Sequence, residues 1–332
     1  MCNIAGYVGT HRAAPILFEM IQKQEGLTGG YYTGIATIHE GKIYSAKLTG
    51  DSKTLLKNTD ALSFPGNIGI IHSRSKSGGG DEWAHPFIAG GRLAYAANGF
   101  AGIFSSEKEK QNLIAQALID EGYALSSRVK TDNTEYLCLS DGTAVHMSDV
   151  MANLIWKHES MEKAFLTMPG QIVGLMIDKY DEKNINFARI DYPMSLAFSS
   201  HGAYLSSAAL AFPEDAKESM LLPACSSGKI SKDAVTIKPF EKAPADVAPI
   251  DSVIRNKAFA LISKALSEGE KTANELVEII KPVFGKNQCC PALYLVYDVL
   301  YGLKKELIIN KARAEGVLKG TTAPEFRLRL KE

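Results

Sequence analysis

The sequence lacks the features that would indicate a membrane or secreted protein. None of its apolar runs approaches the roughly 18 residues that a membrane-spanning helix needs. Its first ten residues, MCNIAGYVGT, do not contain the basic segment followed by an apolar one that forms a secretory signal. We therefore expect no membrane association and a cytoplasmic location, where thiols stay reduced.

The sequence also lacks a net charge and a metal-binding cysteine pattern. Its 37 Lys and Arg residues balance 37 Asp and Glu residues, so nothing indicates a global nucleic-acid or acidic-membrane partner. Its five cysteines include no pair of C-x-x-C motifs of the kind that holds zinc. We expect neither a metal nor another cofactor. Length (332 residues) and composition (45% apolar, 22% charged) are typical of a globular enzyme with one large domain, or a large and a small one.

Hydrophobic periodicity divides the chain into two parts. Residues 2–240 show strand patterns at both ends and helical patterns between them, including 107–119, 133–140 and 147–165, which favours a layered α/β or α+β domain with antiparallel pairing. Residues 241–251, EKAPADVAPID, are rich in alanine and proline and are interpreted as a linker. Residues 252–332 carry three helical patterns, at 251–267, 273–284 and 291–307, and a short strand pair, and are predicted to form a small helical domain.

Position two of the chain carries a cysteine, and this position has a chemical consequence. Methionine aminopeptidases remove Met1 when a small residue such as cysteine follows, which leaves a thiol and a free amine on Cys2. A free α-amine has a pKa near 8 and can act as a general base at neutral pH, so no separate histidine is required. The other interpretation is a cysteine that happens to lie early in a first strand.

Four motifs resemble one enzyme family in their order and spacing. MCNIAGYVG, GIIHSRSKSGG, AHPF and NGF, between residues 1 and 100, resemble the class II glutamine amidotransferases, which are N-terminal-nucleophile hydrolases. The likeness is strongest to the glutaminase domain of glucosamine-6-phosphate synthase and covers residues 2 to about 240. It implies an α+β fold with a four-layer αββα sandwich. It also implies hydrolysis of the glutamine side-chain amide to glutamate and ammonia through an N-terminal cysteine thioester.

The resemblance assigns roles to individual residues. Cys2 matches the nucleophile, and the Asn98 side-chain amide with the Gly99 N–H matches the oxyanion hole. Arg74 matches the arginine that binds the α-carboxylate of glutamine, a role that suits a bidentate guanidinium. Ser77 matches a hydroxyl position in the same carboxylate site.

An acidic residue should hold the α-ammonium group of glutamine. The family segment resembles T-D-T-E, and residues 130–135 read KTDNTE, with one extra residue. A gapless match places Asn133 at the acidic position, but we favour Asp132 because a partly buried ammonium needs an anion.

Each motif residue also has a structural interpretation. Arg74 could form a structural ion pair, and Asn98-Gly99 could be a hairpin turn. His72 and His85 are interpreted as structural hydrogen-bonding residues and not as catalytic groups.

The sequence departs from the family near residue 30. Relatives carry R-G-x-D-S-x-G-I where this chain has TGGYYTGI, from Thr28 to Ile35, so both charges are missing. In the family, this arginine supports the surroundings of the nucleophile. Trp83 and Ala97 also replace the residues usual at the pocket rim. Two alternatives therefore stay open: a γ-glutamyl amide hydrolase acting on another small molecule, and a non-catalytic glutamine-sensing or regulatory protein.

The C-terminal region carries no synthase motif of the family, so we expect the ammonia acceptor to be bound by another chain. Residues 252–332 contain 14 basic and 9 acidic residues and loosely resemble a winged helix. Residues 291–303 offer almost none of the Arg, Lys, Asn or Gln side chains with which a recognition helix reads DNA. We therefore expect no nucleic-acid partner, and expect this segment to form core or an interface with a synthase partner or a second copy.

Overall fold

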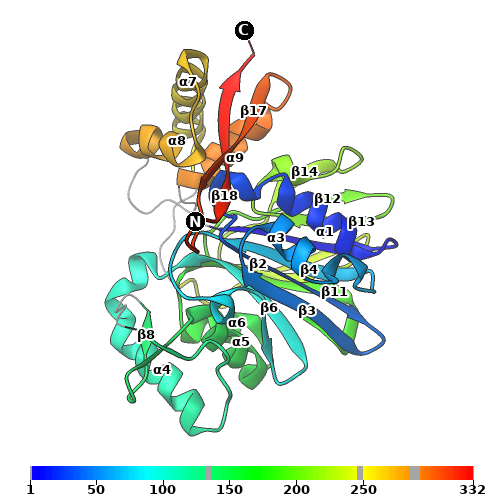
Figure 1. Cartoon of the computed structure of the whole chain (residues 1–332), viewed down its shortest axis with the longest axis vertical. Coiled ribbons are helices and arrows are strands. Elements are labelled where there is room, and N and C mark those ends of the chain that lie inside the picture. Colours follow the sequence, from blue (N-terminus) through cyan, green and yellow to red (C-terminus); the bar gives the residue numbers. More distant parts are fainter. Residues whose placement is uncertain (1, 132–135, 245–249, 284–291, 332) are drawn as a thin grey trace.

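The computed structural model describes residues 2–131, 136–244, 250–283 and 292–331, which form a mixed α/β fold (Figure 1). Two antiparallel sheets dominate it, and the first strand begins at Asn3, directly after Cys2. The strands of the seven-stranded sheet are, in spatial order, β14 (Lys217–Leu221), β12 (Ser195–Ser199), β13 (Gly202–Ser206), β1 (Asn3–Gly9), β4 (Ile68–Arg74), β2 (Tyr32–His39) and β3 (Lys42–Thr49). Those of the six-stranded sheet are β16 (Val235–Pro239), β15 (Ser226–Ile230), β11 (Asp181–Arg189), β10 (Gln171–Asp178), β6 (Leu93–Phe100) and β5 (Phe87–Ala89).

The two sheets bury a common apolar core. Ile4 and Ile70 of the first sheet belong to the same cluster as Val173, Leu175 and Phe187 of the second. Strands of this kind alternate their side chains between two faces, so the opposite face of each sheet needs a second cover.

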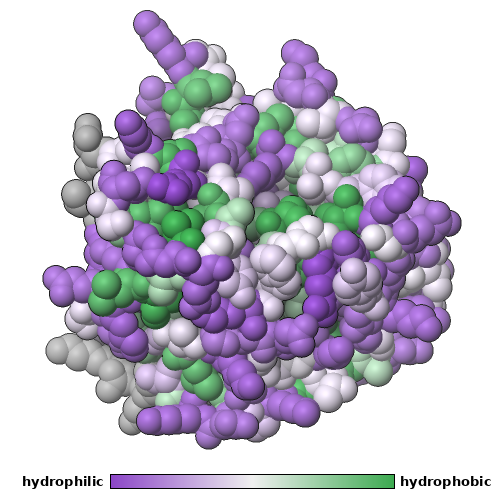
Figure 2. Space-filling view, turned by 90° about the horizontal axis from the view of Figure 1, so that it is seen from below, coloured by the Kyte–Doolittle hydropathy of each residue, from purple (hydrophilic) through white to green (hydrophobic). Residues whose placement is uncertain are grey.

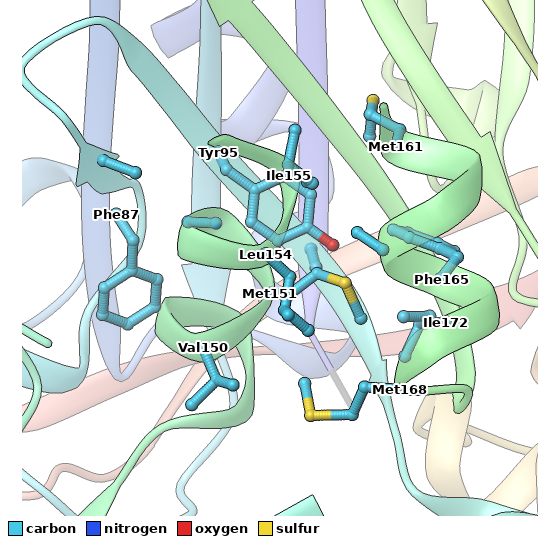
Figure 3. Close-up of a cluster of buried hydrophobic side chains, with 14 of the residues drawn as sticks. Phe87, Tyr95, Val150, Met151, Leu154, Ile155, Met161, Phe165, Met168 and Ile172 are labelled. Atoms are coloured by element: carbon cyan, nitrogen blue, oxygen red, sulfur yellow. The ribbon is translucent and has the colours of Figure 1, made fainter. Parts of the chain in front are cut away.

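Helices provide that cover on both sides. Leu17 of α1 (Ala13–Gln22) and Leu55 of α3 (Ser52–Asn58) pack in a cluster with Ile35 of the first sheet. On the second sheet, Figure 3 shows side chains of α5 (Met147–His158) and α6 (Met161–Thr167) directed toward Tyr95 and Ile172. The helix α4 (Lys108–Asp120) packs against the same cluster.

Two helix predictions in this region need correction. The segment 147–165 forms two helices because Glu159 takes a left-handed conformation (φ 49°) and Ser160 caps α6 by accepting from the Lys163 N–H. The helix predicted at 133–140 is wrong for its described part, because β8 (Leu137–Cys138) pairs with β9 (Thr143–Val145). The pairing of Leu137 with Val145 satisfies the backbone there. The short strand β7 (Val129–Lys130) completes this small sheet.

Short helical segments complete the N-terminal part. They are α2 (Glu25–Thr28), η1 (Ala61–Ser63), η2 (Asp81–Trp83), η3 (Gly102–Glu107) and η4 (Ala209–Ala211).

Three helices and a hairpin follow residue 251, as the pattern predicts. They are α7 (Ser252–Glu268), α8 (Ala273–Ile280), α9 (Ala292–Gly302), β17 (Leu307–Glu315) and β18 (Thr322–Leu330), with η5 (Lys281–Val283) after α8. Their side chains share a separate core that includes Ile262, Leu276, Leu295 and Leu328. The domain boundaries themselves stay a prediction.

The C-terminal elements pack directly on the segment that follows α1. A Cβ at Gly26 would meet the Phe326 ring at 2.3 Å, and one at Gly30 would meet Pro324 at 2.5 Å. Arg313 of β17 donates to the buried Asp51 carboxylate at 2.7 Å. Glycine at two positions of this segment therefore lets the hairpin approach the backbone closely.

Within the described ranges, no helix is both long enough and apolar enough to span a bilayer. On the face seen in Figure 2, apolar side chains gather in several groups bordered by polar ones. The most exposed large apolar residues include Ile103 and Leu113.

Candidate active site

A cavity of about 670 Å³ lies where the sheets meet the C-terminal helices. Four of the six predicted site residues line it: Cys2, Arg74, Ser77 and Gly99. Its remaining wall is mostly apolar and includes Tyr95, Phe100, Leu137, Met147, Met151, Ile172, Val277, Ala292 and Leu293.

Cys2 and Asn98 are hydrogen-bonded to each other, although Cys2 directly precedes β1 of one sheet and Asn98 lies on β6 of the other. The Asn98 side chain on β6 donates from Nδ2 to the Cys2 carbonyl at 2.6 Å, and its Oδ1 accepts from the Cys2 nitrogen at 3.2 Å. Asn98 is fully buried. Such a two-way contact fixes both the backbone of the cysteine and the nitrogen that becomes its amine once Met1 is removed.

Gly99 continues the same strand. Asn98 pairs with Val173 and Gly99 with Ile172, so these two residues are part of β6 and the hairpin-turn interpretation is wrong. Gly99 has φ +143°, and a Cβ there would meet the Gln171 carbonyl oxygen at 2.2 Å. Only glycine fits this conformation without strain.

The Cys2 sulfur lies in a setting that favours the thiolate. Burial raises the pKa of the thiol, but the adjacent His72, the N-terminal charge and the Ser75 N–H together outweigh this effect, and the pKa falls to about 6. No His72 ring nitrogen meets the geometry of a hydrogen bond to a described residue, so His72 acts through proximity. The Ser75 N–H donates to Sγ at 3.4 Å. A thiolate at neutral pH is the nucleophilic form of cysteine.

Arg74 presents a buried cation to the cavity. It is 2% exposed, and its guanidinium donates to the Gly78 carbonyl at 2.8 Å and to the Ser77 carbonyl and Tyr136 hydroxyl, each at 3.1 Å. It also lies over the Tyr32 ring, 4.7 Å from its centroid. Among the described residues no carboxylate pairs with it. A buried guanidinium so placed is suited to bind an anionic ligand.

The remaining two predicted residues have different outcomes. Ser77 lines the cavity, but its hydroxyl is exposed and donates to the Ser75 carbonyl at 3.2 Å, so Ser77 meets Arg74 through its backbone. Asp132 and its alternative Asn133 lie outside the described residues.

The rings of three histidines, His72, His85 and His146, lie close to one another near the nucleophile. The ring centroids of His72 and His85 are 4.0 Å apart, and those of His85 and His146 are 5.0 Å apart. Burial, together with neighbouring positive groups, holds the pKa of His85 and His146 well below the ordinary value, so these two rings are neutral. The nitrogens of His85 have no hydrogen-bond partner among described residues, so the prediction of a hydrogen-bonding histidine is wrong there. His72 acts on the Cys2 thiol, and that neither ring is catalytic stays a prediction.

Sequence reasoning missed three contributors to this site. Ser75 acts through its backbone N–H, Tyr136 through its hydroxyl on Arg74, and Tyr297 through contacts with Asn3 and Thr28 behind the nucleophile. Ser75 lies within the motif GIIHSRSKSGG, but a backbone N–H gives no side-chain signal, and Tyr136 and Tyr297 lie outside the four motifs. Within the described ranges, no group of three or more His, Cys, Asp or Glu residues could hold a metal ion.

Comparison with known sequences identifies relatives of one kind. No model of a known protein family matches the chain. The chain is 26% identical over 310 residues to the isomerizing glutamine–fructose-6-phosphate aminotransferase of Pyrococcus horikoshii, which covers 92% of this chain and 46% of that protein. It is 28% identical over 201 residues to the Synechocystis protein of the same name, covering 60% of this chain and 30% of the relative. The chain thus spans about half the length of the first relative or less.

Solved structures share the fold at low sequence identity. The allosteric regulatory enzyme of purine biosynthesis superimposes with a TM-score of 0.59 and 17% identity over 81% of this chain and 59% of that one. The glutamine phosphoribosylpyrophosphate amidotransferase of B. subtilis gives a TM-score of 0.59 and 14% identity over 93% of this chain and 66% of that one. By sequence the chain resembles glutamine–fructose-6-phosphate aminotransferases, and its fold resembles that of glutamine amidotransferases, so the predicted resemblance to the class II glutamine amidotransferases is confirmed.

Proposed function

We propose that the protein hydrolyses the side-chain amide of glutamine with Cys2 as its N-terminal nucleophile. The observation that carries this proposal is that a low-pKa thiol and a buried guanidinium line one cavity, while a buried amide is hydrogen-bonded to the backbone of the residue that bears the thiol. A glutamine needs each of them: a nucleophile for its amide carbon, a donor for the developing oxyanion and a cation for its α-carboxylate.

The first half-reaction forms a thioester. With Met1 removed, the Cys2 amine takes the thiol proton, and the sulfur attacks the amide carbon. The second hydrogen of Asn98 Nδ2 and the Gly99 N–H stabilise the negative oxygen of the tetrahedral intermediate. The amine then gives its proton to the leaving nitrogen, the C–N bond breaks, and ammonia departs.

The second half-reaction regenerates the enzyme. A water molecule gives a proton to the Cys2 amine and adds to the thioester carbon. The C–S bond breaks, the sulfur recovers a proton, and glutamate leaves. Throughout both halves, Arg74 holds the α-carboxylate, the Ser77 segment shapes the same subsite, and Asp132 pairs with the α-ammonium group.

The arrangement of the sheets and helices supports the fold that this proposal requires. The two facing sheets with outer helices support a four-layer αββα sandwich over residues 2–240. The three helices and hairpin after residue 251 are consistent with a winged-helix-like domain joined by the linker 241–251. Burial of Leu293, Leu295 and Tyr297 in α9 assigns that helix to core packing.

The proposal is tested by mass spectrometry of the purified protein. We expect the mass of one methionine to be missing. After treatment with an electrophilic diazo-ketone analogue of glutamine, we expect one adduct, located on Cys2, and loss of glutaminase activity. A fully active protein that retains Met1 contradicts the proposal.

A second candidate is the hydrolysis of a γ-glutamyl amide with a substituent on its nitrogen. The cavity of about 670 Å³ is in the range that accommodates drug-sized ligands and is larger than free glutamine requires. Its apolar wall, including Met151 and Ile172, suits a substituent on the leaving group. Comparing kcat/KM for glutamine and for γ-glutamyl alkylamides decides between the candidates, since turnover of glutamine alone removes the second.

We further propose that another polypeptide binds the acceptor of the ammonia. The names of the related aminotransferases pair glutamine with a separate acceptor, fructose 6-phosphate. An equimolar release of glutamate and free ammonia that no added partner changes would contradict this part of the proposal.

A further inference from the structure

The C-terminal helix α9 reaches the residue next to the nucleophile. Tyr297 is 2% exposed, and its hydroxyl accepts from Asn3 Nδ2 at 3.2 Å and lies 2.9 Å from Thr28 Oγ1. The Thr28 hydroxyl donates to Asn3 Oδ1 at 3.2 Å. With Tyr297 donating to Thr28, the three side chains form a closed ring in which each hydroxyl donates once and accepts once.

This ring holds the start of β1. Asn3 follows Cys2 directly and pairs with Ser73 of β4, while Thr28 precedes the turn whose Gly30 N–H donates to the Ser73 hydroxyl at 2.7 Å. Asn3 is fully buried and Thr28 nearly so. Loss of the Tyr297 hydroxyl would leave an amide hydrogen and a hydroxyl oxygen without partners, and buried groups of this kind shift to regain one.

One member of this hydrogen-bonded ring, Thr28, lies where the chain departs from the family motif. Thr28 occupies the place at which the motif of the resembling family has an arginine, so this chain has no charge behind the nucleophile there. Burial raises the pKa of the Tyr297 hydroxyl, and the nearby Cys2 raises it further, so the phenol keeps its proton and can donate.

Other contacts attach the C-terminal elements to the sheets without Tyr297. The Arg313–Asp51 ion pair and the contacts of Phe326 and Pro324 with the backbone at Gly26 and Gly30 lie on the hairpin, away from α9. The attachment of the C-terminal elements to the sheets and the positioning of Cys2 by Tyr297 can therefore be tested separately.

We propose that Tyr297 is a positioning residue that fixes Cys2 through its hydrogen-bonded ring with Asn3 and Thr28, which makes the C-terminal domain part of the catalytic apparatus. Its effect on turnover rests on the proposed glutaminase function. Its effect on the geometry of the thiol does not.

The test is Tyr297→Phe in the full-length protein, which removes one oxygen atom. Tyr301→Phe is the matched control, because it removes the same atom from the same helix and no hydrogen bond of its hydroxyl to another described residue is seen. For each protein we would measure glutaminase kcat and KM, the rate of Cys2 alkylation by iodoacetamide across pH by peptide mass spectrometry, and the melting temperature.

We expect Tyr297→Phe to lower kcat by about 10- to 100-fold with KM within about twofold, as displacement of a reacting group does. The alkylation rate or its pH midpoint should also change, while Tyr301→Phe stays within about twofold of the unmodified protein. Thr28→Val should reproduce the effect, and the double variant should be no worse than either single one, because both open the same ring.

An unchanged alkylation profile in a folded Tyr297→Phe protein overturns the inference, even if its melting temperature falls. If that protein does not fold, Thr28→Val gives the same decision. If the unmodified protein has no glutaminase activity, the proposed function fails, and the alkylation rates still decide the role of Tyr297.

Discussion

The two walls of the cavity are built differently. The side of the cavity formed by the sheets carries buried polar groups, each held by several hydrogen bonds: Arg74 lines the cavity, and Asn98 contacts the lining residue Cys2. The wall from the C-terminal helices presents the buried aliphatic side chains of Val277 and Leu293. Its charged residues, Glu278 and Lys281, pair with each other and are largely exposed to solvent. Polar groups with fixed partners can stabilise charge as it develops, whereas aliphatic groups can only exclude water and limit size. The comparison indicates that the sheets supply the chemistry and the helices select what enters.

The largest effect is expected for Asn98→Ala, which removes a buried polar group from the sheet side of the site. Because one oxyanion donor and the contact with the Cys2 nitrogen are lost, kcat for glutamine should fall by about 10²- to 10³-fold. Steady-state kinetics measures this. The control is Asn153→Ala, which removes a buried amide from α5 that donates to the Asp149 carbonyl and does not line the cavity. Equal losses in both variants would mean that Asn98 is only structural.

The second test is Arg74→Lys, which keeps the charge and removes the planar fork. We expect KM for glutamine to rise by roughly 10- to 100-fold with a smaller change in kcat, because bidentate carboxylate binding is lost. Arg92→Lys is the control, since Arg92 pairs with Asp178 and Glu159 away from the cavity. An unchanged KM in Arg74→Lys would remove Arg74 from the substrate site.

The third test separates His72 from the other stacked rings. With a pKa of about 6, the Cys2 thiol is roughly 90% ionised at pH 7. In His72→Asn the pKa of the Cys2 thiol should rise toward its ordinary value, because the effect of His72 is lost while that of the N-terminal charge and the Ser75 N–H remains, and alkylation at pH 7 should slow by about tenfold. The midpoint of the pH–alkylation curve measures the shift. His85→Asn should leave the midpoint in place because that ring is neutral. The same midpoint in both variants would contradict the role of His72.

The smallest effect is expected on the apolar wall. Leu293→Ala enlarges the cavity, so kcat/KM for a γ-glutamyl alkylamide relative to glutamine should rise by about 3- to 10-fold. Leu295→Ala, equally buried on the same helix but not lining the cavity, controls for lost packing. A large loss of glutamine turnover in Leu293→Ala alone would contradict this division between the two walls, because the helices would then contribute to catalysis.

Local signals predicted much of the fold and part of the site. The helical spacing predicted within residues 252–332 corresponds to α7, α8 and α9. Cys2, Arg74 and Gly99 carry their signals in short motifs, and all line the cavity. The helix expected at 133–140 failed in its described part, because apolar spacing over eight residues does not distinguish a helix from two short strands.

Contacts distant in sequence could not be predicted in this way. Tyr297 and Asn3 are 294 residues apart, and only the packing of α9 on the sheets brings them together. The effect of His72 on Cys2 likewise depends on the pairing of β1 with β4, which places Ile4 opposite His72. Tyr297 lies outside the four motifs, and the motif that contains His72 does not indicate its effect on the thiol.

The shared burial of Leu27 and Ala208 with the C-terminal helices has a practical consequence for anyone shortening this protein. A recombinant fragment that stops near residue 240 would expose both apolar side chains to solvent, together with the Asn3 side chain at the start of the first strand, which Tyr297 contacts. Such a fragment should aggregate or become sensitive to proteases. Supplying residues 250–332 as a separate peptide should restore it, as in a split enzyme.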